Sequence, residues 1–133
     1  MGHKPIVAAC LFALAFGACG TGEREDDAAA VTERFHAALD AGDGQVACDE
    51  LSEETASKLE QEEQKPCEEA ILDLDLSKGG TVVVRHVEMG SAYTRLAEGG
   101  ADFLDEGPEG WKVSAAGCRP TVPDRPYECE LEG

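Results

Sequence analysis

The order of segments along the chain predicts an α+β domain, with N-terminal helices packed on an antiparallel sheet. Apolar residues recur at helical spacing from Val31 to Leu39, which predicts a long amphipathic first helix. The pattern changes at residues 77–80, and β-branched residues dominate the segment that follows. Short alternating segments separated by glycine turns then continue to the C-terminus. Helices followed by an antiparallel meander are typical of the α+β class.

Four helices are expected before residue 77, because a residue that favours a helix start precedes each helical segment. These residues are Asp26 or Asp27 for the first helix, then Asp43, Ser52 and Pro66. Gly42 is expected to end the first helix as a C-terminal cap.

The strands are expected in the C-terminal half, where turn residues separate the alternating segments. The expected strands are residues 81–89, 92–97, 101–104 and 111–115, with a last edge strand over 127–131. Gly90 and Ser91 would form the first two-residue hairpin turn, with glycine where a type II′ turn favours it.

The N-terminus resembles a bacterial export signal, in which a short basic segment precedes an uncharged apolar one. Residues 6–18 carry no charge, and they are too few to span a membrane. The sequence Phe16-Gly17-Ala18-Cys19 resembles a lipobox, in which small residues precede a cysteine that receives a lipid. We expect a signal peptide at residues 1–18, a lipid on Cys19, a tether at 19–25 and one domain at 26–133. Cleavage by an ordinary signal peptidase, followed by secretion, is the alternative.

Charge excludes some classes of partner. The formal net charge is −17, and removal of the signal segment with Lys4 would make it −18. Such a surface repels nucleic acid, so we expect no nucleic-acid partner. The sequence contains no CxxC pair and no carboxylate ladder of the EF-hand type, and we expect neither a metal nor a cofactor.

The cysteines after Cys19 number four, an even count that suggests two disulfides in an exported chain. Three pairings are possible. We favour Cys48 with Cys67, which would join neighbouring helices, and Cys118 with Cys129, which would close a proline-rich turn. If Cys19 carries a lipid, no thiol is left over.

Two segments resemble the NTF2-like (SnoaL-like) superfamily. The helix ending in Asp40-Ala41-Gly42-Asp43 is similar to the opening of these domains, and the strand Gly110-Trp111-Lys112-Val113 is similar to their closing strand. The cysteine-containing C-terminus also resembles that of small actinobacterial lipoproteins. The resemblance covers residues 26–133 and implies an NTF2-like cone, in which helices wrap a curved sheet around a pocket. It implies no particular activity, and it allows a homodimer through the sheet.

Chemistry in such a pocket would need a His–Asp or Tyr–Asp pair. The candidates are His36, Asp40, His86, Tyr93 and Asp102. His36 and Asp40 are four positions apart, so they share a helix face that we expect to be partly exposed. His86 alternates with Val82 and Val84, which would point it inward, opposite Tyr93.

A pocket formed by His86, Tyr93 and Trp111 is therefore the sharpest site hypothesis, although no catalytic residue is assigned. The nucleophile motifs GxSxG and HExxH are absent from the sequence. We expect a lipoprotein on the outer face of the cell membrane, held there by its lipid, with a non-catalytic domain that binds an envelope protein or a small ligand. A small isomerase or hydrolase that uses His86 and Tyr93 is one alternative, and a purely structural envelope protein is another.

Overall fold

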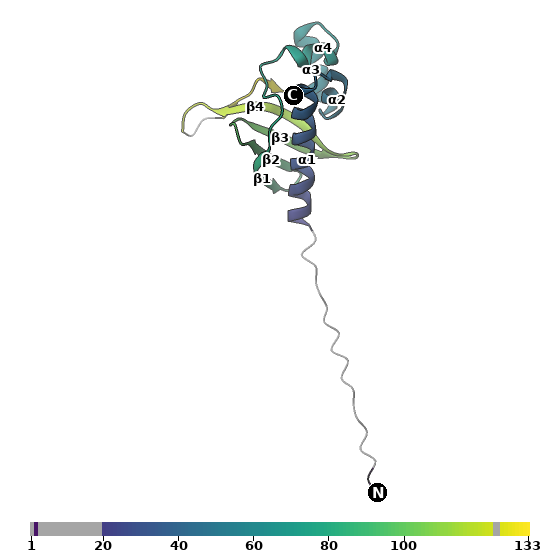
Figure 1. The fold of residues 1–133 in the computed structure, drawn as a ribbon, viewed down its shortest axis with the longest axis vertical. Coiled ribbons are helices and arrows are strands. Elements are labelled where there is room, and N and C mark those ends of the chain that lie inside the picture. Colours follow the sequence, from purple (N-terminus) through teal and green to yellow (C-terminus); the bar gives the residue numbers. More distant parts are fainter. Residues whose placement is uncertain (1, 3–19, 124–125) are drawn as a thin grey trace.

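A computed structural model describes residues 2, 20–123 and 126–133 (Figure 1). The predicted signal segment and Cys19 lie outside these residues, apart from Gly2. The elements are α1 (Thr21–Asp40), α2 (Gly44–Asp49), α3 (Glu53–Glu63), α4 (Cys67–Asp73), β1 (Val82–Glu88), β2 (Ser91–Leu96), β3 (Ala101–Gly107), β4 (Gly110–Pro120), β5 (Tyr127–Glu128) and β6 (Leu131–Glu132). Helices precede strands, which confirms the α+β prediction.

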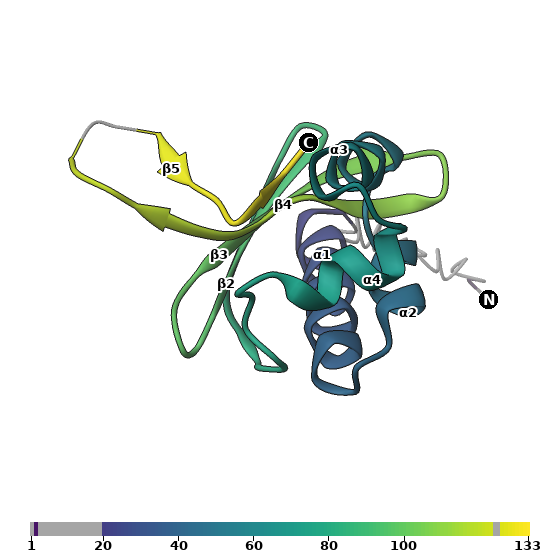
Figure 2. The same ribbon diagram turned by 90° about the horizontal axis from the view of Figure 1, so that it is seen from above.

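The strands form one six-stranded antiparallel sheet that is not closed into a barrel. Its order is β1-β2-β3-β4-β5, and β6 also pairs with β4. Both C-terminal strands therefore pair with the long strand β4. Figure 2 shows β4 continuing into the loop that leads to β5. Leu51 adds a single parallel bridge to Val113, which ties the segment between α2 and α3 to β4.

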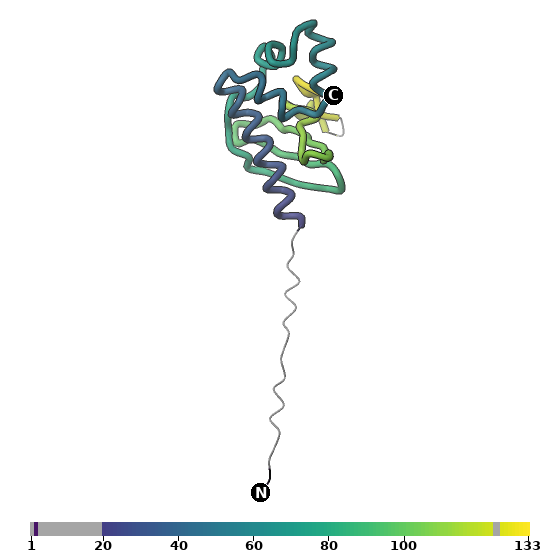
Figure 3. Tube along the Cα trace, turned by 90° about the vertical axis from the view of Figure 1, so that its right-hand side faces the viewer, coloured from purple at the N-terminus to yellow at the C-terminus, as the bar shows by residue number. Residues whose placement is uncertain are grey.

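Helix α1 lies on one side of the sheet, as the side view in Figure 3 shows. Helices α2, α3 and α4 gather at its C-terminal end, away from Thr21 (Figure 1). We call residues 43–75 the helical lobe. In the part of the chain that the structure describes, no helix is long and apolar enough to cross a membrane.

Helix α1 begins earlier than the sequence predicts. It starts at Thr21 rather than after Asp26 or Asp27, so residues expected in the tether are helical. Contacts made by Arg24 explain the extra turn. Its guanidinium donates to the Met89 carbonyl oxygen at 2.7 Å and to Glu106 at 2.5 Å, and it lies over the Trp111 ring. Tertiary contacts thus stabilise a helix start that no side chain caps.

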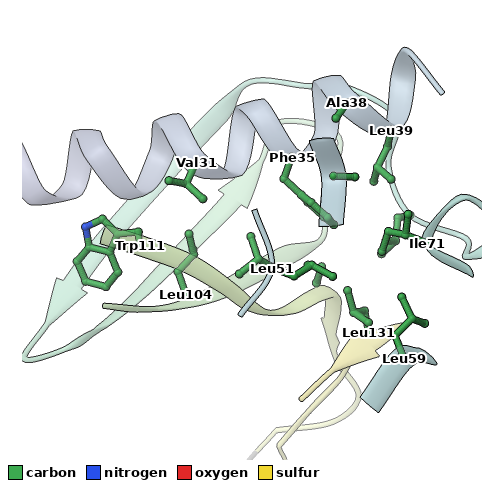
Figure 4. Close-up of a cluster of buried hydrophobic side chains, with 14 of the residues drawn as sticks. Val31, Phe35, Ala38, Leu39, Leu51, Leu59, Ile71, Leu104, Trp111 and Leu131 are labelled. Carbon is green, nitrogen blue, oxygen red and sulfur yellow. The ribbon is translucent and has the colours of Figure 1, made fainter. Parts of the chain in front are cut away.

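The core lies between α1, the sheet and the helical lobe (Figure 4). The predicted stripe of α1 supplies Val31, Phe35 and Leu39, all buried. They face Leu104 of β3 and Ile71 of α4, which are fully buried. Burial of each such side chain contributes roughly 1.5–3 kcal/mol, so this cluster holds the lobe, the helix and the sheet together.

The first hairpin turns one residue earlier than predicted. Glu88 pairs with Ser91, so Met89 and Gly90 form the two-residue turn in place of Gly90 and Ser91. Met89 has a positive φ of 55°, a conformation that a primed hairpin turn requires and that glycine would adopt more easily. The prediction put the glycine first in the turn, whereas the paired strands place it second.

The C-terminal strand is shorter and divided. The expected strand over 127–131 is replaced by two-residue strands on either side of Cys129, which is bonded to Cys118. The second disulfide joins Cys48 of α2 to Cys67 of α4. Both predicted pairings are therefore confirmed. One disulfide joins two helices of the helical lobe, and the other attaches the C-terminal segment to β4.

Intact mass measured before and after reduction under denaturing conditions tests these bonds. Two disulfides predict a gain of about four hydrogens, because each bond takes up two on reduction. Replacement of Cys48 and Cys67 together by serine is expected to lower the free energy of unfolding by about 3 kcal/mol. Thiols that react in the denatured, unreduced protein at any of the four positions would contradict the pairing.

Candidate functional site

A buried histidine–aspartate pair joins α1 to the sheet. His36 is 1% exposed and Asp102 of β3 is 2% exposed. The His36 Nε2 atom lies 2.5 Å from Asp102 Oδ2, and its Nδ1 atom lies 2.6 Å from the Ser77 carbonyl oxygen. The other carboxylate oxygen, Oδ1, accepts from the Gly117 backbone N–H at 3.1 Å. The pair therefore connects α1, the segment before β1, and strands β3 and β4.

The partners of His36 define its protonation state. The Ser77 carbonyl oxygen can only accept, so Nδ1 of His36 carries a proton, and Nε2 shares the second hydrogen bond with Asp102 Oδ2. Burial by itself would lower the pKa of His36. The hydrogen bond and charge of Asp102, helped by the Ser77 carbonyl and the charge of Glu98, outweigh burial and raise this pKa above 6.5. The raised pKa favours the imidazolium form of His36 beside Asp102.

Two threonines extend the buried polar network beside this pair. The hydroxyl oxygens of Thr32 on α1 and Thr94 on β2 lie 2.8 Å apart, and Thr94 donates to the Asp102 carbonyl oxygen at 3.5 Å. Within residues 20–123 and 126–133, every buried side-chain nitrogen and oxygen has a hydrogen-bond partner. The network is thus satisfied internally and leaves no buried polar group directed at a ligand.

The expectations for His36 were partly wrong. We expected it to be partly exposed beside Asp40, but it is buried, and Asp40 lies exposed at the end of α1. The partner is Asp102, 66 residues away. Both residues were among the sequence candidates, yet only the packing of α1 on the sheet brings them together.

The predicted pocket residues do not converge. Tyr93 lies opposite His86 as expected, but His86 is exposed and does not point inward. A register shift between Val82 and Val84 explains the error, because it reverses the alternation of β1 after Val82. Trp111 is buried in the core beneath Arg24, as part of the cluster that contains Leu104.

Tyr93 instead belongs to an aromatic cluster with Phe103 and Tyr127. The ring centroids lie 5.5 Å apart for Tyr93 and Phe103 and 5.4 Å apart for Phe103 and Tyr127. Burial beneath these rings, together with the neighbouring Tyr127 phenol, raises the pKa of Tyr93 above 10.0. The cluster packs short β5 against β2 and β3 and gives Tyr93 a structural role.

A groove of about 590 Å³ lies between the helical lobe and the β3–β4 hairpin. It combines apolar residues with several carboxylates and one lysine. Its lining residues are Cys48, Asp49, Leu51, Ser52, Glu53, Ala56, Asp105, Glu106, Gly107, Pro108, Glu109 and Lys112. We call this the lobe–hairpin groove. The sequence analysis missed it, and the only signal was the number of carboxylates in both segments.

A smaller apolar hollow of about 140 Å³ lies at the other side of the lobe, between α1 and α4, and is lined by residues such as Leu39 and Ile71. Among the residues that the structure describes, no three histidine, cysteine or carboxylate side chains gather as metal ligands.

No family model, curated protein or solved structure matches this chain. The function of this chain must therefore be inferred from the geometry of its own residues.

Loss of the Asp102 carboxylate tests the importance of the buried pair. Asp102→Ala would leave His36 Nε2 and the Gly117 N–H without their hydrogen-bond partner, and we expect the free energy of unfolding to fall by about 1–3 kcal/mol for each unsatisfied group. Asp105→Ala is the matched control on the same strand, since Asp105 is exposed and accepts a hydrogen bond from Ser91. It should cost no more than about 1 kcal/mol. Equal losses in urea unfolding would contradict the assignment.

The raised pKa of His36 also predicts a pH dependence. The folded state binds this proton more tightly than the unfolded state, so the stabilisation is fully present below pH 6.5. It is lost as pH rises through the raised pKa of the folded state. The free energy of unfolding of the wild type should therefore approach that of His36→Gln as pH increases. The exposed His86→Gln variant should follow the wild type, and a constant difference between wild type and His36→Gln would rule out this linkage.

Proposed function

We propose that this protein is an exported envelope lipoprotein whose domain binds a partner protein on its outer surface without catalysing a reaction. The burial of the His36–Asp102 pair is the observation that supports a binding role without catalysis. An acid–base pair must reach a substrate proton within hydrogen-bond distance. Both residues are at most 2% exposed and their polar atoms bond to the protein itself.

The two disulfides support the proposal that the protein is exported. Disulfides form and persist in oxidising compartments outside the cytoplasm, and both staples here close short loops in a small domain. The export signal and the lipid on Cys19 are inferred from the sequence alone. Lipidation would modify Cys19, which belongs to neither of these two disulfides.

The start of α1 at Thr21 would leave only Gly20 between a lipidated Cys19 and the helix. The domain would then sit directly on the membrane, with no long tether. Helix α1 has 20 residues, about 30 Å of rise, and the helical lobe lies at its far end. The acidic lobe would thus be the part presented to other envelope proteins, away from anionic lipid.

We further propose that the helices and sheet form an NTF2-like cone, as the resemblance implies. The long first helix on one side of an antiparallel sheet and the strand that contains Trp111 support this. The core side chains and the His36–Asp102 pair lie between α1 and the sheet, where an open cone would hold a ligand. A surface-bound protein partner therefore fits the structure better than an enclosed small ligand or a reaction at His86.

Metabolic labelling with a radioactive fatty acid in a bacterial host tests the lipid anchor. The wild-type protein should carry label and fractionate with membranes, whereas Cys19→Ala should lose both properties. Cys10→Ala is the matched control, because Cys10 lies too early in the signal segment to be the modified residue. Mass spectrometry of the membrane-purified protein should place the lipid on an N-terminal Cys19. Unlabelled wild-type protein in the medium would show free secretion instead.

A further inference from the structure

The lobe–hairpin groove has the chemistry of a peptide-binding site. Resting on the proposed role as a surface-binding module, we propose that it binds a cationic, partly apolar segment of a partner protein. Its volume of about 590 Å³ falls within the ~300–1,000 Å³ typical of ligand pockets.

Four apolar residues of the lining, which we call the floor of the groove, supply an apolar contact, and we call the lining carboxylates its rim. Cys48, Leu51 and Ala56 line it from the helical lobe, and Pro108 lines it from the hairpin. Leu51 is itself held in place by hydrogen bonds on both sides, since Ser52 N–H donates to the Val113 carbonyl and Val113 N–H donates to the Glu50 carbonyl. The Cys48–Cys67 disulfide fixes the same wall. The floor is therefore rigid, which lowers the entropy lost on binding.

The rim is acidic on both sides. Glu53 on the lobe and Glu109 on the hairpin have no hydrogen-bond or ion-pair partner among the residues that the structure describes. Two other lining carboxylates are engaged, since Glu106 pairs with Arg24 and Asp105 accepts from Ser91.

Lys112 is the lysine of the lining, and its ammonium is already used. It donates to the backbone carbonyl oxygen of Asp49 at 2.6 Å, which ties the hairpin strand to the end of α2. The Asp49 carboxylate accepts instead from Gln45 at 3.1 Å. The carboxylates that remain at the rim thus outnumber the available cations, and a ligand with several positive charges would complete the site.

The surrounding lobe adds attraction at longer range. Residues 43–75 contain twelve carboxylates but only Lys58 and Lys65 as cations, so this segment holds more than half of the net charge of −17. Each of these lysines already pairs with a carboxylate of the lobe, Glu62 and Asp73 respectively. Such a field speeds the approach of a cationic partner.

The same charge disfavours other occupants. A second copy of this chain would bring an equally acidic lobe against the groove, and the two would repel each other. Nucleic acid and anionic lipid headgroups are repelled for the same reason. An apolar floor under an acidic rim is complementary to a segment in which lysine or arginine flanks a leucine-like side chain.

Two synthetic peptides of equal length and equal charge separate the groove from general electrostatic attraction. One alternates lysines with leucines and the other alternates lysines with serines. Isothermal titration of the purified protein should show at least ~10-fold tighter binding of the lysine–leucine peptide, because one buried leucine side chain accounts for that difference. Equal affinities for the two peptides would overturn the proposal, since the floor would then contribute nothing.

A pair of charge-matched variants locates the binding. Glu53→Gln with Glu109→Gln removes two rim carboxylates, whereas Glu63→Gln with Glu69→Gln removes two exposed carboxylates of the lobe outside the groove. The rim variant should bind the lysine–leucine peptide at least ~5-fold more weakly, and the control should stay within about twofold of wild type. Thermal unfolding checks that both variants are folded. Equal losses in the two variants would overturn the proposal.

The labelling experiment on Cys19 and this titration fail independently. A lipidated protein that shows no groove-dependent binding overturns the peptide site alone. A protein that binds the peptide through the rim but carries no lipid overturns the lipid anchor alone.

Discussion

The buried ion pair between His36 and Asp102 constrains the rest of the structure. Charges in an interior are costly unless each is paired and hydrogen-bonded, and here the Ser77 carbonyl and the Gly117 N–H complete both groups. Helix α1 places His36 within hydrogen-bond distance of Asp102 on β3. This position also fixes where the apolar stripe of α1 meets the sheet, so the core around Phe35 follows from the same contact.

The pair is also a polar network whose hydrogen bonds are made within the fold. A histidine and an aspartate at hydrogen-bond distance resemble an acid–base pair, but their polar atoms are already used within the fold. Their effect is on stability and on its pH dependence. The exposed chemistry of this protein is in the carboxylates of the helical lobe and of the β3–β4 hairpin, which meet at the lobe–hairpin groove.

Much of the fold could be predicted from the sequence because it depends on local patterns. The stripe through Val31 and Leu39, the Ser52 cap, which accepts from the Thr55 N–H, and the disulfide pairs were all predicted from spacing. The errors arose where one residue changes the pattern. The shift after Val82 reversed the side chain of His86, and the turn at Met89 moved the hairpin by one residue. Neither irregularity can be recognised from the alternation of apolar and polar residues in the sequence, because each depends on how neighbouring strands pair.

The sequence by itself determined the order of helices and strands, the acidic charge and the even number of cysteines after residue 19, and it favoured one of their three possible pairings. These properties depend on composition and on contacts between near neighbours, and the bonded cysteines are separated by 19 and 11 positions in the sequence. The tertiary structure decided the partner of His36, the start of α1 and the existence of the groove. Each of these joins segments tens of residues apart, such as Arg24 and Glu106, and a long-range contact is defined only when the whole core is packed.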